Sequence, residues 1–141
     1  MQLSEAEARR RLTGARVVRL ATADADGVPH VVPATFAVRG DAIVIAVDAK
    51  PKRHTNLRRL RNVAANPHVS VLADHYDDDW ARLWWARADG TARVVDAAAA
   101  GDGLDGLVAK YPQYRAQRPD GPVIEIGVTR WSGWSFTGIV D

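Results

Sequence analysis

The stretch Arg82 to Val95 (RLWWARADGTARVV) constrains the fold of this chain more than any other feature. Its even-numbered positions from 84 to 94 are all apolar or small, whereas the charged side chains fall at odd-numbered positions after Trp85. A period of two is typical of a β-strand with one inward face. Small inward residues suit the narrow interior of a small barrel. We therefore expect a long strand within a small antiparallel barrel.

Further apolar and β-branched segments predict the rest of the barrel. They lie at residues 16–23, 28–38, 42–47 and 69–74, and residues 123–130 and 132–139 close the chain as strands. Residues 24–27 form a turn in which Gly27 suits a positive φ, and residues 39–41 form another. Pro29 and Pro33 cannot donate to a ladder, which indicates an edge or a bulge. Together these segments predict a mainly β fold, a six-stranded antiparallel barrel with a few helices.

Two helices are expected from their end signals. Ser4 and Glu7 match a capping box, and the helix that follows ends near Gly14. A second helix spans residues 54–65, with Leu57, Leu60 and either Val63 or Ala64 along one side. Asn66 and Pro67 stop it. Residues 97–117 form a helical and loop excursion broken by glycines and Pro112.

Composition limits the class of protein. A chain of 141 residues with 47% hydrophobic and 26% charged residues is a single globular domain, residues 1–141. No apolar run approaches the roughly 20 residues of a bilayer span, and the acidic start is not a secretory signal. The absence of cysteine excludes thiolate sites and fits a reducing cytoplasm. A net charge of +2, with its cations bunched in one segment, argues against nucleic acid as a partner.

That basic segment is the strongest functional signal. Residues 50–61 hold six cations and no acid, and the second helix begins in their middle. Lys50, Lys52 and Arg53 precede or open the helix, where unpaired backbone N–H groups attract anions. The cap of this helix is expected from one of three side chains, His54, Thr55 or Asn56. We interpret the front of the segment as a phosphate site, and Arg58, Arg59 and Arg61 as a solvated helix face.

Two other groups are candidates for cofactor contacts. The first group is Thr22 on the first strand together with Pro33-Ala34-Thr35 on the second. These are either ordinary strand residues or contacts along the edge of a planar ring. Backbone groups freed by Pro33 would bind the polar edge of such a ring. Trp131 and Trp134, near Gly133, are candidates to cover a cofactor across an interface, whereas Trp84 is expected in the core or at a dimer interface.

Other chemistries lack their signatures. The four histidines are scattered without metal-ligand spacing, and residues 77–79 are interpreted as a solvated acidic loop rather than a metal site. No Ser-His-Asp arrangement, Walker loop or Rossmann glycine motif appears. Chemistry supplied by a bound organic cofactor therefore fits this sequence better than chemistry supplied by side chains.

At this point the motifs resemble a known family. The segments RVVRLATADADGVPHVVPATF, AIVIAV, KPKRHTNLRRLRNVAANPHVSVL and RLWWARADGTARVV, in this order, are similar to split β-barrel flavin and deazaflavin oxidoreductases related to pyridoxamine 5′-phosphate oxidase (the PPOX class). More narrowly, they resemble the branch that uses the deazaflavin coenzyme F420. The most specific part is the order of strand, Lys/Arg cluster, Asn-Leu helix, Asn-Pro and strand.

The resemblance implies a homodimer with two cofactor sites at the subunit interface. It implies that the phosphate lies on Lys50, Lys52, Arg53, His54 and Asn56, and the ring near Thr22, Pro33, Ala34 and Thr35. Late residues of the second subunit, with Trp131, Trp134 and Ser135 as candidates, complete the site. The carboxy end lacks the Arg-x-His pattern of true pyridoxamine-phosphate oxidases, which argues against pyridoxal phosphate synthesis.

The sequence-based hypothesis is a reductase that moves a hydride between reduced coenzyme F420 and a small conjugated or quinone-like acceptor. One alternative keeps the fold and binds FMN or FAD. Another is a non-enzymatic module that binds haem or sequesters the cofactor. The sequence does not identify the acceptor, because the loops at residues 74–81 and 97–121 shape its pocket.

Overall fold

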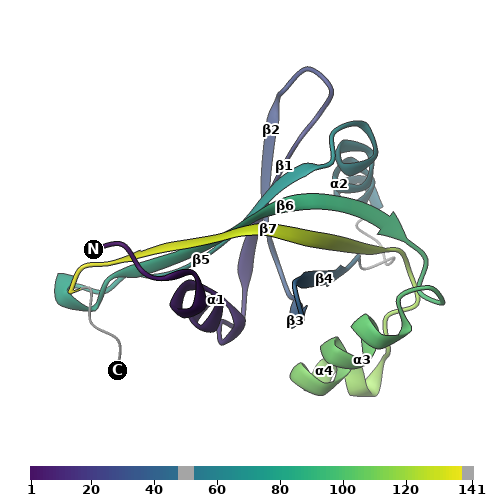
Figure 1. Ribbon diagram of the computed structural model, residues 1–141. Helices are drawn as coiled ribbons and strands as arrows, with labels where there is room; N and C mark the ends of the chain where they lie inside the picture. The colour runs from purple at the N-terminus through teal and green to yellow at the C-terminus, as the bar shows by residue number, and fades with distance from the viewer. Residues whose placement is uncertain (48–52, 138–141) are drawn as a thin grey trace.

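The computed structural model describes residues 1–47 and 53–137, and for residues 53–57 it describes the backbone alone. Within these ranges the strands form one antiparallel sheet in the order β2-β1-β5-β6-β7-β4-β3 (Figure 1). Its strands are β1 (Val18–Ala23), β2 (Pro29–Ala34), β3 (Ala37–Arg39), β4 (Ala42–Ala46), β5 (His68–His75), β6 (Trp84–Val95) and β7 (Val123–Ser135). The helices are α1 (Glu5–Thr13), α2 (Arg53–Ala65), η1 (Trp80–Arg82), α3 (Gly101–Lys110) and α4 (Pro112–Ala116).

The sheet curls round because its two outermost strands, β2 and β3, are neighbours in the chain. Only Thr35 and Phe36 separate them, so the chain passes from one edge of the sheet to the other within two residues. This arrangement confirms the predicted mainly antiparallel β class with peripheral helices. The placement of Pro29 and Pro33 on an edge strand is also confirmed, because β2 has β1 as its one neighbour in the described sheet.

The strand count differs from the predicted six, because the described sheet has seven strands. The predicted strand 28–38 is two strands, since Phe36 is buried and its N–H donates to the Tyr111 hydroxyl instead of to a ladder. The predicted strands 123–130 and 132–139 are one strand, β7, within the described residues. A bulge opposite Asp89 and Gly90 in β6 absorbs the irregularity there, so pairing continues past it.

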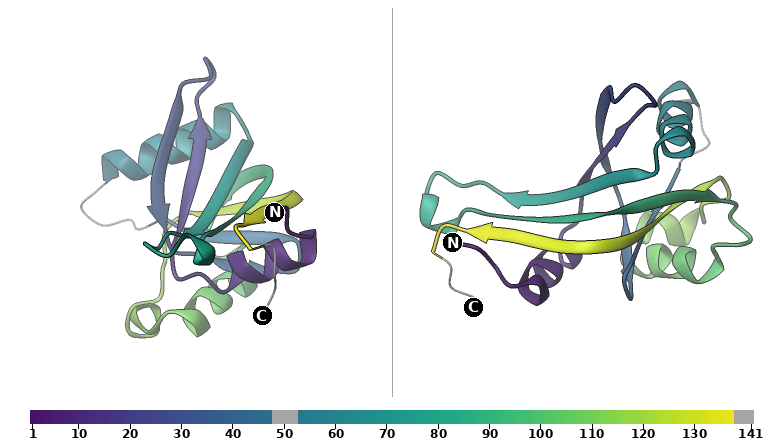
Figure 2. Two further views of the ribbon diagram at one scale, coloured as in Figure 1. Left: turned by 90° about the vertical axis from the view of Figure 1, so that its left-hand side faces the viewer. Right: turned by 45° about the horizontal axis from the view of Figure 1, so that its top comes forward.

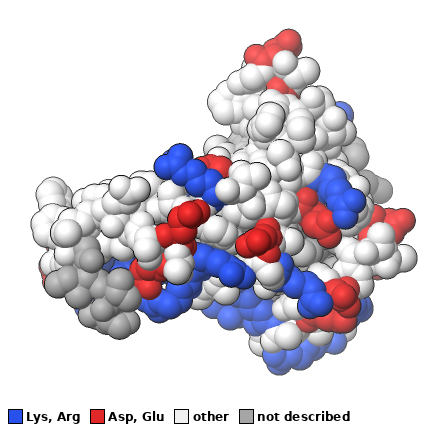
Figure 3. All heavy atoms as spheres, in the orientation of Figure 1, with Lys and Arg blue, Asp and Glu red and all other residues white. Residues whose placement is uncertain are grey.

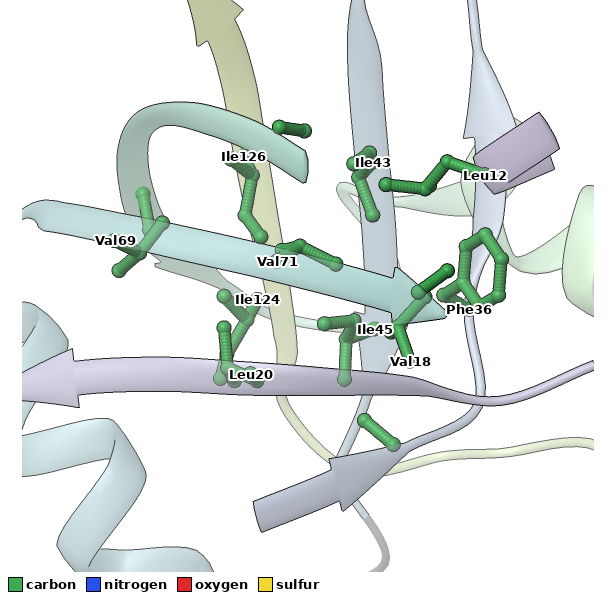
Figure 4. Close-up of a cluster of buried hydrophobic side chains, with 14 of the residues drawn as sticks. Leu12, Val18, Leu20, Phe36, Ile43, Ile45, Val69, Val71, Ile124 and Ile126 are labelled. Atoms are coloured by element: carbon green, nitrogen blue, oxygen red, sulfur yellow. The ribbon is translucent and has the colours of Figure 1, made fainter. Parts of the chain in front are cut away.

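The core lies inside the curled sheet and is built from branched aliphatic side chains (Figure 4). The inward face predicted for β6 is confirmed, since Ala86, Ala88, Gly90 and Ala92 are buried. Val94 is the exception at the far end, where it is exposed. Side chains from β1, β4, β5 and β7 fill the space above these small residues, among them Leu20, Ile43, Ile45, Val71, Ile124 and Ile126.

The first helix packs on β6 and β7, as Figure 2 shows beside the N-terminus. The Ser4 hydroxyl accepts the Glu7 N–H at 3.1 Å, which confirms the predicted cap. The Glu7 carboxylate, however, binds Arg10 and Arg11 rather than closing the capping box. A Cβ on Gly133 would lie 2.8 Å from the Trp85 carbonyl oxygen, so only glycine permits this close approach.

The remaining local predictions are confirmed with small shifts. Gly27 and Gly40 adopt positive φ angles of 82° and 59° in the two predicted turns. In α2, Val63 is buried whereas Ala64 is exposed, which decides between the two alternatives. None of the helices in the described ranges combines the length and the apolarity that crossing a bilayer requires.

Candidate cofactor site

The junction between α2 and β1 holds the first candidate residue. Asn62 on α2 donates a hydrogen bond of 3.0 Å to the Thr22 hydroxyl on β1, and both side chains are buried. Thr22 therefore fixes the helix that begins with the basic segment onto the sheet. Asn62 is a site residue that was not predicted from the sequence. The signal for it is a polar side chain beside Val63, on the apolar side of the helix.

His30 lies on β2 directly opposite Thr22. Its Nδ1 atom is buried, and no described residue gives it a hydrogen-bond partner. Burial, followed by the positive charges of Arg58 and Arg59, holds the pKa of His30 below its usual value. The ring is therefore neutral at neutral pH.

A groove of about 540 Å³ runs across the sheet beside Thr22. Its volume lies in the range of small-molecule sites, roughly 300–1,000 Å³. Its walls are mostly small or flat, which leaves space for a planar ligand over the backbone. The lining residues from β1, β2, β5 and β6 include Ala21, Ala23, Pro29, Val69, Gly90 and Thr91.

One side of the groove is polar. The Ser70 hydroxyl donates to the Asp89 carboxylate at 2.6 Å, and Arg87 Nε donates to the other carboxylate oxygen at 3.3 Å. The Thr129 hydroxyl donates to the Asp89 carbonyl at 3.1 Å. Asp89 is thus held in place by its neighbours and offers the groove a fixed acceptor.

The segment Pro33-Ala34-Thr35 lies at the opposite end of β1 from Thr22. Ala34 faces Val18, four residues along the strand from Thr22, which corresponds to about 13 Å. Thr35 hydrogen bonds to Tyr114 at 2.7 Å through the two hydroxyls. The structure therefore places the predicted ring contacts along one hairpin but not at one point, so a ligand contacting all of them must be elongated.

The predicted phosphate ligands fall mainly outside what the structure describes. Lys50 and Lys52 lie outside the described residues. Arg53, His54 and Asn56 occupy the first turns of α2, where the backbone alone is described. The helix begins at Arg53, one residue before the predicted start, so the cluster remains at a helix N-terminus as predicted. Its binding of an anion stays a prediction.

The two late tryptophans differ in exposure. Trp131 is 8% exposed, packs in the core and lies under the Arg9 guanidinium, 5.7 Å from its ring centroid. Trp134 is 36% exposed and lies opposite Trp85, with Phe136 edge-on to its ring. Trp134 is therefore the more accessible of the two to a second molecule. Their role in a partner's site stays a prediction.

The acidic loop forms local contacts. Asp77 accepts a hydrogen bond from the Asp79 N–H, which holds the pKa of Asp77 below its usual value, and it lies 3.6 Å from both His75 and Arg82. Asp79 caps η1 through the Ala81 N–H. Within residues 1–47 and 53–137 no group of three metal-ligating side chains comes together.

The family model described as pyridoxamine 5′-phosphate oxidase matches residues 4–135. The chain belongs to the pyridoxamine 5′-phosphate oxidase family. This membership accounts for the curled antiparallel sheet and confirms the broad resemblance found in the sequence. No curated protein matches this chain.

Solved structures share its fold at low sequence identity. A FAD-binding protein from Mesorhizobium loti is 24% identical with a TM-score of 0.72, over 94% of this chain and 95% of the other. A FAD-binding protein from Mycobacterium smegmatis is 22% identical with a TM-score of 0.63, over 95% and 96%. HutZ, the heme storage protein from Vibrio cholerae, is 19% identical with a TM-score of 0.68, over 93% of each chain. At these levels of sequence identity, the similarities show that the chain shares the fold of these proteins.

Proposed function

We propose that this member of the family is a coenzyme F420-dependent oxidoreductase that transfers a hydride between the deazaflavin and a small conjugated or quinone-like acceptor. The observation that carries the proposal is the groove beside β1, bounded by strands with small side chains. On the inward face of the same strand, the hydrogen bond between Asn62 and Thr22 holds α2 against β1. A flat redox ring fits such a groove, and the basic segment at the start of the same helix suits its phosphate.

The charges around α2 support an anionic ligand. Within the described part of the chain no carboxylate pairs with Arg58 or Arg61. Opposite charges are interspersed over the face of the molecule shown in Figure 3, so the cations do not merge there into one broad basic field. A local anion site on α2 therefore fits better than the extended basic surface that nucleic acid requires.

The residues of the site fit binding and positioning rather than strong acid–base chemistry. When bound, the deazaflavin supplies the hydride that is transferred. Lys50, Lys52 and Arg53 would hold its phosphate. The ring would lie over the groove at Thr22, and because Pro33 to Thr35 lie farther along the same hairpin, its far edge would face them. The small groove walls exclude water from the ring face once it is covered.

A homodimer is part of the proposal. Val31 on β2 is 61% exposed and lies opposite Ala21, which lines the groove. A second copy that covers Val31 therefore also reaches the groove. The long strands β5, β6 and β7 extend beyond the rest of the sheet in Figure 2, and they carry Trp134 near their ends. This extension would allow one subunit to contribute Trp131 or Trp134 to the site of the other.

FMN or FAD is the second candidate cofactor. It is favoured by the shared fold of proteins described as FAD-binding. A flavin offers the same ring shape and phosphate, so the groove and the basic segment would serve it equally. A binding module for heme is a further alternative, after the heme storage protein HutZ. Heme iron needs an axial ligand from the protein, and His68 is the histidine that lines the groove.

The test is a fluorescence titration of the purified protein with coenzyme F420, FMN and FAD side by side. We expect the tightest binding for coenzyme F420. Lys52→Ala and Arg53→Ala should each raise its dissociation constant about 10- to 150-fold, since a hydrogen bond to a charged group contributes about 1.5–3 kcal/mol. The matched control is Arg39→Ala, which removes an exposed cation paired with Asp102 and should leave the affinity unchanged.

Turnover of quinone and nitroaromatic acceptors with the reduced cofactor then separates an enzyme from a sequestering module. If FMN or FAD binds more tightly than the deazaflavin, the proposed cofactor is wrong and the proposed site still stands. Unchanged affinity in both lysine and arginine variants would mean that the anion does not lie at the start of α2.

A further inference from the structure

Two tyrosines of the α3–α4 segment reach the corner where the chain passes from β2 to β3. Tyr111 joins the two helices and Tyr114 lies within α4, with their rings edge-on at 5.7 Å. The corner residues, Thr35 and Phe36, belong to neither strand. Each tyrosine hydroxyl binds one of them, although about 75 residues of chain lie between. The corner is thus held from outside the sheet.

Tyr111 satisfies backbone groups. Its hydroxyl accepts the Phe36 N–H at 3.1 Å and donates to the Arg16 carbonyl at 2.8 Å. Burial raises the pKa of Tyr111, so the phenol keeps the proton that it donates. Removing this hydroxyl would leave a buried N–H and a carbonyl without this partner, which costs folding stability. The role of Tyr111 is therefore structural.

Tyr114 binds a side chain instead. Its hydroxyl lies 2.7 Å from Thr35 Oγ1. A phenol is a stronger acid than an aliphatic alcohol, so the phenol is the preferred donor of the pair. Thr35 then accepts this bond, and its own single proton is directed to another acceptor. Thr35 is partly exposed and follows Pro33 and Ala34, the segment assigned to the ring.

Neighbouring cations fix the segment that carries the two tyrosines. Lys110 Nζ lies 3.5 Å from the centroid of the Phe36 ring, and the Arg16 guanidinium lies 4.9 Å from that of Tyr111. Arg16 also donates to the Lys110 carbonyl at 3.1 Å. The α3–α4 segment is thus held on the corner at several points, and Tyr114 meets Thr35 in a defined position.

We propose that Tyr114 is a positioning residue for the cofactor: by donating to Thr35 Oγ1 it turns the Thr35 O–H toward the acceptor atoms on the edge of the bound ring. The inference rests on the proposed function, because it takes Thr35 as a contact of the ring. The ligand class it specifies is a planar ring with carbonyl oxygens or unprotonated nitrogens on the edge that faces Thr35. Tyr114 and Thr35 then act as one unit.

A double-mutant cycle tests this coupling. The dissociation constant of the cofactor that the parent binds is measured by fluorescence for Tyr114→Phe, Thr35→Val and the double variant, with the melting temperature of each. Each single change should weaken binding about tenfold, and the double variant should lose no more than either single one. Thr35→Ser, which keeps the hydroxyl, should bind like the parent.

Two further variants separate positioning from folding. Tyr111→Phe should lower the melting temperature by roughly 3–10 °C and leave the affinity unchanged below its transition. Tyr76→Phe, at an exposed tyrosine, should change neither quantity. Unchanged affinity in Tyr114→Phe, multiplied losses in the double variant, or equal losses in Thr35→Ser and Thr35→Val would overturn the inference and leave the proposed function standing. A parent that binds neither deazaflavin nor flavin would overturn both.

Discussion

Glu7 shows how a single buried carboxylate organises the start of the chain. It accepts hydrogen bonds from Arg10 at 2.6 and 2.7 Å and from Arg11 at 2.6 Å. The hydrogen bonds from Arg10 are the main cause that lowers the pKa of Glu7 to about 2, against burial, which raises it. Because Arg11 also lies over the Trp84 ring, the carboxylate links α1 to β6 through that arginine.

Glu7→Gln should lower the free energy of unfolding at pH 7 by about 1–3 kcal/mol, since it removes the negative charge and one of the two oxygens that accept from Arg10 and Arg11. The ordinary pKa of 4.5 exceeds the value of about 2 in the fold, so the unfolded chain binds more protons between them. The contribution of Glu7 is therefore complete above pH 4.5 and is lost as the pH falls through about 2. Urea unfolding at pH 7 and pH 2.5 measures it.

The control for Glu7 is Glu125→Gln, which breaks a surface pair with Arg93 and should cost less than about 1 kcal/mol. The destabilisation in Glu7→Gln should shrink at pH 2.5. A loss of the same size at both pH values would show that the charge of Glu7 does not stabilise the fold.

The strands illustrate where local patterns predict an element and where they do not. The inward face of β6 was predictable because alternation is encoded residue by residue, and it holds from Ala86 to Ala92. The break between β2 and β3 was not predictable from the local pattern, because it depends on the Tyr111 hydroxyl, and Tyr111 lies 75 residues from Phe36 in the sequence. The continuity of β7 likewise depends on a bulge at Thr129, which is defined only by its pairing with Asp89 and Gly90 of β6.

Gly90 at this bulge should not tolerate a side chain. A Cβ there would lie 2.2 Å from the Gly127 carbonyl oxygen and 3.1 Å from the Val128 Cα, and backbone atoms cannot move aside cheaply. Gly90→Ala should therefore lower the free energy of unfolding by about 2–4 kcal/mol, as measured by urea unfolding. Gly127→Ala is the matched control, because its Cβ meets no atom closer than 3.9 Å and it should be neutral or slightly stabilising. Equal effects of the two changes would mean that the bulge relaxes.

Across the molecule, the class of fold follows from sequence but the assembly of the site does so only in part. Thr22 was singled out, and the structure connects it to α2 through Asn62, a residue 40 positions away that no local pattern marked. Pro33 to Thr35 were singled out as neighbours of Thr22, yet the register places them at the other end of β1. Strand register and helix docking depend on contacts between residues that are distant in the sequence. Local sequence patterns therefore predict the strands and helices better than they predict which residues of these elements contact one another.

The proposed dimer connects the exposed apolar surface to cofactor binding. Val31 lies opposite Ala21 of the groove, so a second copy seated on Val31 would close the groove as well. The parent should sediment at twice the 15.4 kDa mass of the chain. Val31→Glu would place a charge in the apolar contact, and we expect it to yield monomers and to weaken cofactor binding at least tenfold together.

Val94→Glu provides the matched control, because Val94 is 40% exposed but lies near the C-terminal end of β6, opposite Ile124 and outside the groove lining. It should leave both sedimentation and affinity unchanged. Because dissociation opens the groove in this proposal, the affinity of the parent should also fall when the protein is diluted below its dimer dissociation constant. A parent that binds the cofactor with full affinity while it sediments as a single chain would place the whole site within one subunit, and the tryptophans of β7 would then serve the core and surface of their own chain.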